Sequence, residues 1–562
     1  YQTSGEGGIF DRPYAQIILE IMELLRSDRN DRVTAEKLFD DKIKNVFLNA
    51  DKQKYFSTLQ QWRNEIYAPH GGTRRKLYPQ QLLYDLCDVL SIKSLNNETA
   101  LRDLGLFSTI ILDVEKIYIS IDSASRYRDM LNFFQNIAKN AYELEPIDYL
   151  TKENAVTIST IHKVKGLEFP VVFVADMVSE RFPGKQTKYK GSIPPKLMEE
   201  AIKRGAYGNR TEDEARLFYT AMTRAERILY LSGSEIHPGL KRVKKPSQFM
   251  QAVDNPSMRK DFVLDLLDEK IPSKSKFDES DFPTDYSSVK RYLKCPYSYK
   301  LSTIYGYNTP VPELFGFGKT SHTTLEKLHQ IFKDHSPSDY DIDQIVEDTF
   351  MLKHVFPSKD PENRPGSYER AKELLKKCLK EYVKKYTNDF GRIRQDEARF
   401  ELSVDGALIT GAIDLLLKED ADKGYLSADV IDFKTMESPD NNVDYDWRDM
   451  SIQVQLYSKA AREIMGENVQ TGYIHTLKDN NRIQIPVQDK DVSNAVKVVE
   501  WAVSGIMASD FPQRACKKSC TDCDFRALCE QRHDEFKIAT RPPKINTPNG
   551  EVSVAAVEDD DD

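Results

Sequence analysis

Two stretches, Phe400–Leu417 (FELSVDGALITGAIDLLL) and Ser427–Thr435 (SADVIDFKT), decide the fold of the second half of this chain. Both are rich in aliphatic and β-branched residues and are predicted to be strands, with a polar hairpin segment between them. Helical apolar spacing begins at about Tyr286 and returns after the second stretch. The sequence therefore predicts an α/β unit in this half of the chain.

The size and composition indicate a multidomain globular protein. With 562 residues the chain is too long for one hydrophobic core, and we expect three or four domains. It has no apolar run near the roughly 20 residues that cross a bilayer, so we expect a soluble protein. The chain starts at Tyr1 with neither an initiator methionine nor a signal-peptide pattern, which indicates a fragment of a longer protein.

The character of the sequence changes along the chain. Helical spacing covers Arg12–Arg26 and then almost all of Val33–Leu150. Short β-branched runs follow, AVTISTI, PVVFVADM and, after a helix, RILYLSGS, and these indicate buried parallel strands. Pro246–Asp285 is rich in proline, serine and charge, which predicts one helix and then a linker.

Two long motifs lie in and after the first group of strands. Thr157–Met177 reads TISTIHKVKGLEFPVVFVADM, and Glu212–Leu229 reads EDEARLFYTAMTRAERIL. They resemble motifs V and VI of the UvrD/Rep-like superfamily 1 DNA helicases, in the order of that family. The resemblance implies the second RecA-like lobe of a DNA motor, interrupted by an all-helical accessory insert.

The same resemblance implies roles for single residues. Arg224 would reach the γ-phosphate of ATP and stabilise transition-state charge, a role worth about 10³ to 10⁵ in rate for arginine fingers. Arg216 would support Arg224, and Glu168 would contact the nucleotide sugar. Thr160 and His162 would lie near the DNA track or couple it to ATP.

A motor also needs a P-loop, G-x-x-x-x-G-K-[ST], to cradle the phosphates, and this sequence contains none. Gly316–Thr320 (GFGKT) comes close, but Glu313 occupies the position of the first glycine. We therefore expect no ATP hydrolysis from this chain alone, and ATP as a ligand of the complete protein with its first lobe.

A second group of residues has the chemistry of a metal-dependent nuclease. Asp414 is expected at the end of one strand, and Asp432-Phe433-Lys434 ends the next. Two carboxylates at adjacent strand ends can share Mg²⁺ or Mn²⁺, which activates water and neutralises phosphate charge. Alternation along a strand places Asp432 and Lys434 on one face, where Lys434 would position the water or stabilise the transition state. The backbone carbonyl of Phe433 is expected as an extra ligand.

These residues resemble the PD-(D/E)xK nuclease fold, in its RecB/AddB-type exonuclease branch. The supporting residues Gly318-x-x-x-His322, Glu397 and Gln453-Val-Gln-Leu-Tyr457 follow in the order of that branch. The resemblance implies that His322 is a third metal ligand, and that Gln453 and Tyr457 orient DNA or the catalytic lysine. His329 has no such match and is expected to be structural.

Cysteines form a split set, Cys295 with the distant Cys520-x-x-Cys523-x5-Cys529. Clustered cysteines without signs of secretion favour metal binding over disulfides. The spacing resembles the iron-sulfur staple of AddB and of CRISPR-associated adaptation nucleases, which implies a structural [4Fe-4S] cluster. A Cys₄ zinc site is the competing interpretation. Of the remaining cysteines, Cys516 is a weak substitute ligand. Cys87 and Cys378 are expected in the core.

Two basic segments could contact nucleic acid. The loop Gly71–Lys76 could touch phosphates, although such loops are more often only solvated. In Lys290–Lys300 basic residues alternate with tyrosines, and such a surface can track a single strand by charge and stacking. Packing of those tyrosines around the cysteines is equally expected. The net charge of −9 includes five negatives in Glu558–Asp562, so a DNA groove must be a local basic feature.

Together these features predict a multidomain α/β protein, a DNA helicase-nuclease that processes broken duplex ends for recombinational repair. Its expected ligands are single-stranded DNA and duplex ends, with a possible partner helicase-nuclease subunit, no membrane, and a cytoplasmic, nucleoid-associated location. The alternatives are a DNA-binding scaffold with a vestigial motor lobe, and a single-strand exonuclease that does not unwind. The expected regions, in order, are the first part of the RecA-like lobe, the helical insert, the second part of that lobe, a linker, the PD-(D/E)xK nuclease with its cysteines, and a disordered acidic tail: 1–29, 30–150, 151–245, 246–285, 286–540 and 541–562.

Overall fold

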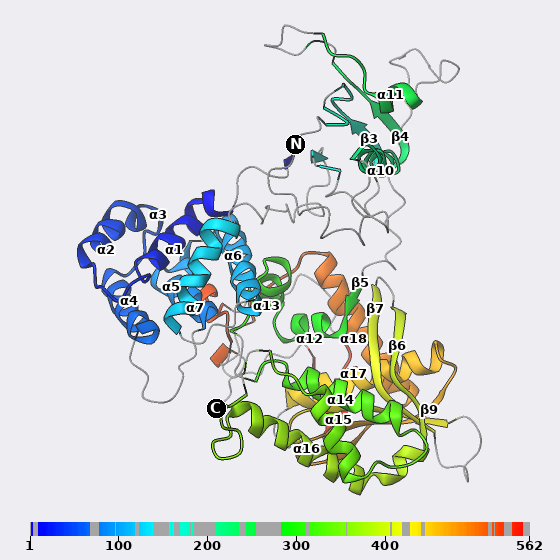
Figure 1. Ribbon diagram of the computed structural model, residues 1–562. Helices are drawn as coiled ribbons and strands as arrows, with labels where there is room; N and C mark the ends of the chain where they lie inside the picture. Colours follow the sequence, from blue (N-terminus) through cyan, green and yellow to red (C-terminus); the bar gives the residue numbers. More distant parts are fainter. Residues whose placement is uncertain are drawn as a thin grey trace, which may run out of the picture. The chain divides into compact units, whose positions relative to one another are not determined.

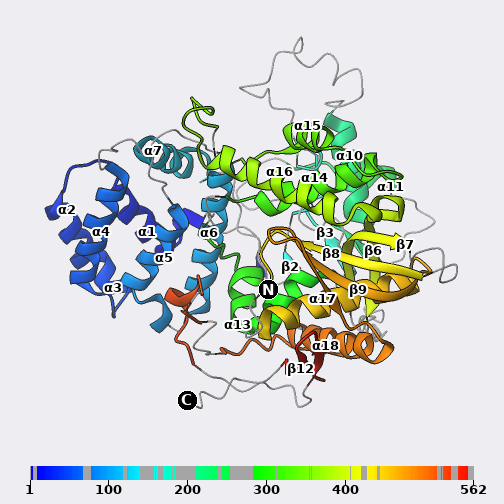
Figure 2. The same ribbon diagram turned by 90° about the horizontal axis from the view of Figure 1, so that it is seen from below.

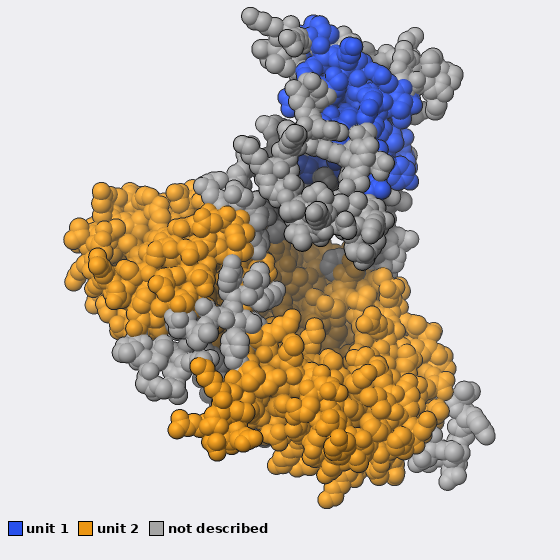
Figure 3. Space-filling view, in the orientation of Figure 1, with its two compact units in different colours: residues 1–6, 144–276 blue, residues 7–143, 277–562 orange. Residues whose placement is uncertain are grey.

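The computed structural model forms two compact units (Figure 3): Tyr1–Glu6 with Leu144–Lys276, and Gly7–Glu143 with Phe277–Asp562. The residues that the structure describes are 2–3, 9–67, 78–95, 97–117, 123–138, 157–158, 160–161, 169–179, 181–184, 210–234, 236, 243–253, 283–310, 314–353, 355, 357–404, 407–418, 427–439, 444–514, 520–521, 523–532 and 542–554.

The first unit is an α/β arrangement of parallel strands. Strand β1 (Gln2–Thr3) pairs with β2 (Thr157–Ile158), and β3 (Phe169–Val174) pairs with β4 (Ala225–Leu231), both in parallel. Its helices are α10 (Arg210–Met222) and α11 (Gln248–Val253).

The parallel pairing expected for these runs is confirmed, but their burial is not. The apolar cluster of this unit contains Val174 from β3 and Phe218 from α10, with Phe249 stacked on Phe218. Among the described side chains of β3 and β4, only Val174 is buried. The residue before it, Phe173, is 66% exposed. Helices therefore cover one face of this described pair of strands, and the pair is half-buried.

The second unit begins with a block of helices. The helical spacing predicted for Val33–Leu150 is confirmed over the described residues of that range. The α-helices of the block are α1 (Pro13–Glu23), α2 (Arg32–Leu38), α3 (Lys44–Val46), α4 (Lys52–Tyr67), α5 (Pro79–Val89), α6 (Glu98–Ile117) and α7 (Ser123–Phe133). Helix α1 packs on α6 and so belongs to this block. The contacts group the whole block, Gly7–Glu143, with the C-terminal half, whereas the sequence-based division placed 1–29 with 151–245.

A mixed six-stranded sheet forms the centre of the C-terminal half. Five strands follow the order β10-β9-β8-β7-β5, and β6 pairs with β7 off this path. Strands β6, β7 and β8 are consecutive and antiparallel, which confirms the predicted hairpin between the last two, while β8 and β9 are parallel. The bounds are β5 (Pro283–Asp285), β6 (Ile393–Val404), β7 (Ala407–Lys418), β8 (Ser427–Lys434), β9 (Asn468–Thr476) and β10 (Asn481–Ile485).

Helices cover both faces of this sheet, which gives an α/β/α sandwich (Figures 1 and 2). Alternate strand residues separate the two cores: Val430 packs with α12, α17 and α18, whereas Ile431 and Phe433 pack with α14, α15 and α16. The α-helices of this half are α12 (Tyr286–Lys294), α13 (Pro296–Tyr299), α14 (Phe317–Ile331), α15 (Asp339–Thr349), α16 (Ser367–Lys385), α17 (Asp444–Glu463) and α18 (Asp489–Met507). None of the described helices is long and apolar enough to cross a membrane.

Parts of the two segments that the sequence assigned to linker and tail form regular secondary structure. The expected linker 246–285 contains the predicted helix, α11, but its last three residues form β5, which pairs in parallel with β7. The expected disordered tail 541–562 contains a hairpin of β11 (Ile545–Thr547) and β12 (Gly550–Val552). Ile545 is fully buried against α17 and α18, so apolar burial fixes this hairpin.

The helical block packs on the part of the C-terminal half that carries the cysteines. The Ser108 hydroxyl accepts a hydrogen bond from the Asn308 amide at 2.8 Å, and Lys300 pairs with Glu98 at 2.5 Å. The ring of Tyr84 on α5 meets the edge of Phe525, which lies in the cysteine segment, with centroids 6.1 Å apart. These contacts explain why the two regions form one compact unit.

Candidate active site

The candidate active site lies on the edge of β7 where two other strands, β5 and β8, pair with different parts of β7. Strand β5 pairs with residues 408–410 of β7, and β8 pairs with residues 415–418. Among the described strands, none pairs with residues 411–414 on that edge. Asp414 therefore lies in the middle of β7, and not at the end of a strand as the sequence indicated, but it lies where pairing with β8 stops.

Asp414 joins β8 through its side chain. Its Oδ2 accepts a hydrogen bond from the backbone N–H of Phe433 at 2.6 Å, which continues the ladder beyond Leu415 and Ile431. Because this bond uses the Phe433 amide, Asp414 is held beside Asp432 on the neighbouring strand. The predicted adjacency of the two carboxylates is thus present, although Phe433 contributes its amide here and its carbonyl remains only a predicted ligand.

Three potential ligands converge at this point. Ligand atoms of His322, Glu397 and Asp414 all lie within 4.8 Å of one another, and all three residues are half-buried. His322 Nδ1 is 3.4 Å from Asp414 Oδ1. His322 comes from α14, and Glu397 lies opposite Asp414 on β6, as the flanking pairs Asp396–Leu415 and Ala398–Ile413 show.

Glu397 is the site residue that the sequence indicated least clearly. The sequence gives it only a supporting place in the family order, yet its carboxylate lies beside the predicted ligands. Its backbone has φ of +42°, a left-handed conformation that costs on the order of 1–2 kcal/mol for a residue other than glycine. Strain of this kind tends to persist where a site requires it.

A chain of polar side chains leads away from Asp432. Lys434 Nζ lies 2.7 Å from Asp432 Oδ2 and donates to Gln453 Oε1 at 2.9 Å. Gln453 Nε2 in turn donates to the Tyr457 hydroxyl at 2.7 Å. Gln453 and Tyr457 are one turn apart on α17, so one face of that helix holds the lysine in place.

The electrostatics of the site reflect crowded negative charge. Burial raises the pKa of Asp432, and Asp414 adds to the rise while Lys434 opposes it. The pKa of Glu397 is also raised, by burial first and then by Asp414. Burial lowers the pKa of His322, but its hydrogen bond to Asp414 and the charges of Asp414 and Asp432 outweigh burial, so the net shift is upward. Like charges this close favour a bound cation.

Asp432 supplies an independent test of whether a cation fits. Its side chain is only 2% exposed, and the described residues give its Oδ2 one charged partner, the Lys434 ammonium group at 2.7 Å. One ammonium group does not balance the three carboxylates of Glu397, Asp414 and Asp432, and oxygen-rich sets with one histidine suit Mg²⁺ or Mn²⁺. The residues present therefore fit a divalent cation.

Close packing of glycine and aromatic rings supports the site from behind. A Cβ on Gly411 would lie 2.7 Å from Phe400 Cζ, so only glycine leaves room for this ring across the β6–β7 pair. The Phe400 ring meets the edge of Tyr457 with centroids 5.6 Å apart. His329, expected to be structural, is buried and bonds the Tyr382 hydroxyl at 3.0 Å.

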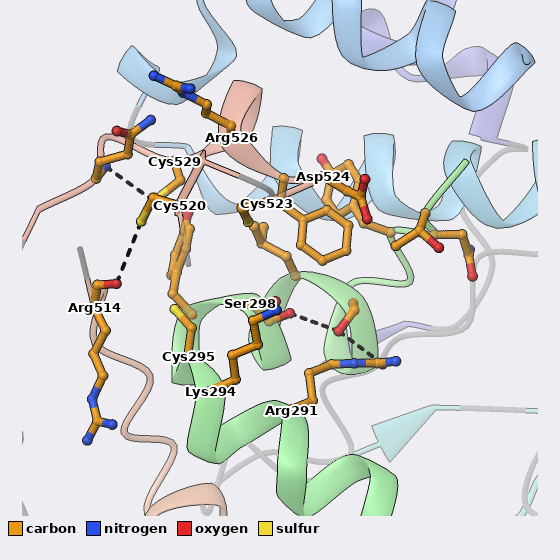
Figure 4. Close-up of a pocket in the computed structure, with 18 of the residues that line it drawn as sticks. Arg291, Lys294, Cys295, Ser298, Arg514, Cys520, Cys523, Asp524, Arg526 and Cys529 are labelled. Atoms are coloured by element: carbon orange, nitrogen blue, oxygen red, sulfur yellow. Dashed lines mark hydrogen bonds between the residues drawn. The ribbon is translucent and has the colours of Figure 1, made fainter. Parts of the chain in front are cut away.

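The four cysteines line one cavity of about 450 Å³ at the C-terminal end of α12 (Figure 4). Cys295 follows α12 directly, and Cys520, Cys523 and Cys529 come from the C-terminal segment on the facing wall. Burial raises the pKa of Cys523, and it raises that of Cys529 to about 11. Cys516 lies outside the described residues, and Cys87 and Cys378 are buried core residues as predicted.

The spacing of the cysteine sulfurs bears on the size of the group that they could hold. Among the described residues, the one trio of ligand atoms within 4.8 Å is the trio at Asp414, so no three cysteine sulfurs come that close. A single tetrahedral Zn²⁺ with Zn–S bonds of about 2.3 Å would place its sulfurs roughly 3.8 Å apart. The wider separation and the cavity fit a larger group such as an iron-sulfur cluster.

The tyrosines near Cys295 pack inward. Tyr292 and Tyr299 are 0% and 4% exposed and belong to the core, and Tyr297 is half-buried in the wall of the cysteine cavity. Lys290, Arg291 and Lys294 line the cysteine cavity. The expectation of packed tyrosines is therefore the correct one, and the loop Gly71–Lys76 lies outside the described residues.

The motor residues fall partly in the described part of the first unit. Arg224 lies between α10 and β4, and its guanidinium donates to the Thr220 carbonyl and the Thr223 hydroxyl, both at 3.0 Å. Arg216 is exposed on α10, and Thr160 is exposed after β2. The predicted nucleotide and DNA contacts Glu168 and His162 lie outside the described residues.

Comparisons with known proteins find a separate family match in each half of the sequence. Residues 15–235 match the family described as UvrD-like helicase C-terminal domain, and residues 285–530 match the PD-(D/E)XK nuclease superfamily. ATP-dependent DNA helicase PcrA of Staphylococcus epidermidis (strain RP62A) is 28% identical over 163 residues, which cover 29% of this chain and 19% of the helicase. The Staphylococcus aureus (strain MRSA252) helicase of the same name is 27% identical over 163 residues, 28% of this chain and 19% of that protein. The chain thus spans about a fifth of these relatives.

A solved structure, "Putative exonuclease" from Eubacterium rectale, matches with 12% identity and a TM-score of 0.29, over 50% of this chain and 97% of that one. A TM-score this low supports no structural argument. The two family matches, in contrast, fall on the two regions that the motifs and the site geometry mark out. The chain therefore combines a UvrD-like helicase C-terminal domain with a nuclease domain of the PD-(D/E)XK superfamily.

Proposed function

We propose that this protein is a DNA helicase-nuclease that processes broken DNA ends, and that its C-terminal half hydrolyses phosphodiester bonds with Mg²⁺ or Mn²⁺. The observation that carries the nuclease proposal is the convergence of His322, Glu397 and Asp414 beside the buried pair of Asp432 and Lys434. Its substrates would be single-stranded DNA and duplex ends, with a partner helicase-nuclease subunit as a further possible component.

Each residue of the site has a role that follows from its position. His322, Glu397, Asp414 and Asp432 would hold the cation. When bound, the cation would activate the attacking water and neutralise charge on the phosphate. Lys434 is poised beside Asp432 to orient that water or to stabilise the negative charge that develops on the phosphate.

The partners of Lys434 restrict where its ammonium group can lie. Gln453 accepts a hydrogen bond from Lys434 and donates one to Tyr457. A lysine fixed in this way loses little conformational freedom during the reaction, which is how preorganised charges contribute to rate.

The nuclease proposal is tested with end-labelled single- and double-stranded DNA in Mg²⁺ or Mn²⁺. Asp432→Ala should abolish cleavage, because it removes a buried ligand beside the lysine. Asp429→Ala is the matched control: it lies on the same strand, but its carboxylate pairs with Arg392 at 2.8 Å, away from the site. Equal cleavage by wild type and Asp432→Ala would refute the assignment.

For the motor half, we propose that Arg224 acts on the γ-phosphate of ATP once the first lobe is present. Support comes from its place at the junction of α10 and β4 within the matched helicase region. DNA-stimulated ATP hydrolysis by the complete protein should fall by about 10³-fold or more in Arg224→Ala, and not in Arg227→Ala, an exposed residue of β4. A complete protein without any such hydrolysis would favour the scaffold alternative.

For the cysteines, we propose a structural [4Fe-4S] cluster held by Cys295, Cys520, Cys523 and Cys529, with Zn²⁺ as the alternative. The cavity and the separation of the sulfurs support the larger group. Anaerobically purified protein should contain iron and acid-labile sulfide, and Cys523→Ala should lose both. Zinc in their place would refute the cluster.

A further inference from the structure

Helix α12 connects the edge of the catalytic sheet to the catalytic helix. It starts immediately after β5, which pairs with β7, and Asp285 caps it by accepting from the Ser288 amide at 2.7 Å. Its first residue, Tyr286, is buried, and its hydroxyl donates to the backbone carbonyl of Asp449 on α17. The N-terminus of α12 and the first turns of α17 are thereby joined by one directed bond.

The carbonyl of Asp449 is one turn before the residue that holds the catalytic lysine. In an α-helix the carbonyl of residue i accepts from the backbone amide of residue i+4, so within α17 the helical partner of the Asp449 carbonyl is the backbone amide of Gln453. Asp449, Gln453 and Tyr457 follow at intervals of four and lie along one stripe of the helix. A displacement of this turn would therefore move the Gln453 side chain relative to Lys434.

The side chain of Asp449 is held as firmly as its carbonyl. Arg448, 1% exposed, donates through Nε and Nη2 to Asp449 Oδ1 at 2.9 and 2.7 Å. Lys290, one turn after Tyr286 on α12, has its ammonium group 3.7 Å from Asp449 Oδ2. Two residues of α12 thus hold the same residue of α17, one through the main chain and one through charge.

We propose that Tyr286 is a positioning residue for the nuclease reaction: through the Asp449 carbonyl it sets the turn of α17 that places Gln453 against Lys434. The inference rests on the proposed nuclease function. Tyr286 does not reach the reacting atoms in this role, so its loss should slow turnover and leave DNA binding and the metal requirement unchanged.

Helix α12 offers a closely matched control. Tyr292 is also buried, and its hydroxyl also donates to a backbone carbonyl, that of Asp510 at 2.7 Å. Asp510 lies after α18, away from Lys434. Tyr286→Phe and Tyr292→Phe therefore each remove one buried hydroxyl from the same helix and should lower the melting temperature by similar amounts, but only the first change reaches α17.

The test measures kcat, KM for labelled single-stranded DNA and the half-saturating Mn²⁺ concentration for the full chain. Tyr286→Phe should lower kcat roughly three- to tenfold with KM and Mn²⁺ dependence unchanged, and Tyr292→Phe should stay within twofold of wild type. In a Gln453→Ala background, Tyr286→Phe should cause no further loss, since both changes release the same lysine.

Several outcomes would overturn the proposal. Equal kcat values for the two tyrosine variants would show that the Asp449 bond has no catalytic consequence, and an additive loss in the Gln453→Ala background would show that Tyr286 does not act through Gln453. These results differ from failure of the nuclease assignment itself, in which wild type and Asp432→Ala would cleave alike.

Discussion

Replacing Glu397 with glutamine should make the metal-free protein more stable and the metal-loaded protein less active. The Glu397 and Asp414 carboxylates lie within 4.8 Å of each other, a separation at which two unit charges repel by about 3 kcal/mol at an effective dielectric constant of about 20. Solvent around the half-buried Glu397 reduces this to on the order of 1 kcal/mol. Removing the charge should therefore raise the melting temperature in EDTA by roughly 1–4 °C.

With Mn²⁺ the order of stability should reverse. Wild type gains stability in proportion to RT ln(1 + [Mn²⁺]/Kd), and the variant, with one anionic ligand fewer, binds the ion more weakly and gains less. Cleavage by Glu397→Gln should require a higher Mn²⁺ concentration for the same reason.

Tryptophan fluorescence is a suitable probe for these melts. The three tryptophans of the chain, Trp62, Trp447 and Trp501, are all buried and all belong to the second unit. Glu401→Gln, an exposed glutamate four residues along the same strand, is the control and should behave as wild type in both conditions. If Glu397→Gln melts no higher than wild type in EDTA and shows the same Mn²⁺ midpoint, Glu397 is not a ligand.

Two further changes test the surroundings of the site and the helical block. Gly411→Ala should cost about 1–3 kcal/mol by overpacking and lower nuclease turnover, because the new Cβ would drive Phe400 toward Tyr457; Gly391→Ala, with open space around its Cβ, should leave both the melt and the cleavage rate unchanged. Burial raises the pKa of Glu115 from 4.5 to about 7, so between these pH values the folded state keeps a proton that the unfolded chain has lost. This carboxyl therefore lowers stability as pH rises through that range, by about 3 kcal/mol in total. Denaturant melts at several pH values should show that fall in the difference between the unfolding free energies of wild type and Glu115→Gln. A difference that does not change with pH would contradict the reasoning.

The sequence was sufficient where side-chain position follows from local periodicity. Asp432 and Lys434 are separated by one residue of a strand and do share a face, as their 2.7 Å contact shows. Gln453 and Tyr457 are separated by four residues of a helix and do bond each other. In both cases the backbone repeat alone determines which side chains meet.

The sequence was insufficient where position depends on pairing between distant strands. Glu397 reaches the site because β6 pairs opposite Asp414, and because its backbone is left-handed, a conformation that favours glycine or asparagine and that no local pattern assigns to a glutamate. The midstrand place of Asp414 has the same origin, since it depends on where β8 stops pairing with β7. The hairpin β11–β12 did have a local signal, Asn549-Gly550 between apolar residues, which the nearby acidic run obscured.

That hairpin determines how the coding region that follows the candidate active site tolerates mutation. The Asn546 carbonyl accepts a hydrogen bond from the buried Gln455 amide on α17 at 3.1 Å, and Ile545 fills the space between α17 and α18. A stop codon just before Lys544 would leave this side of α17 uncovered, although every residue of the candidate active site would still be encoded. In a genetic screen for nuclease loss, such late truncations should group with active-site substitutions.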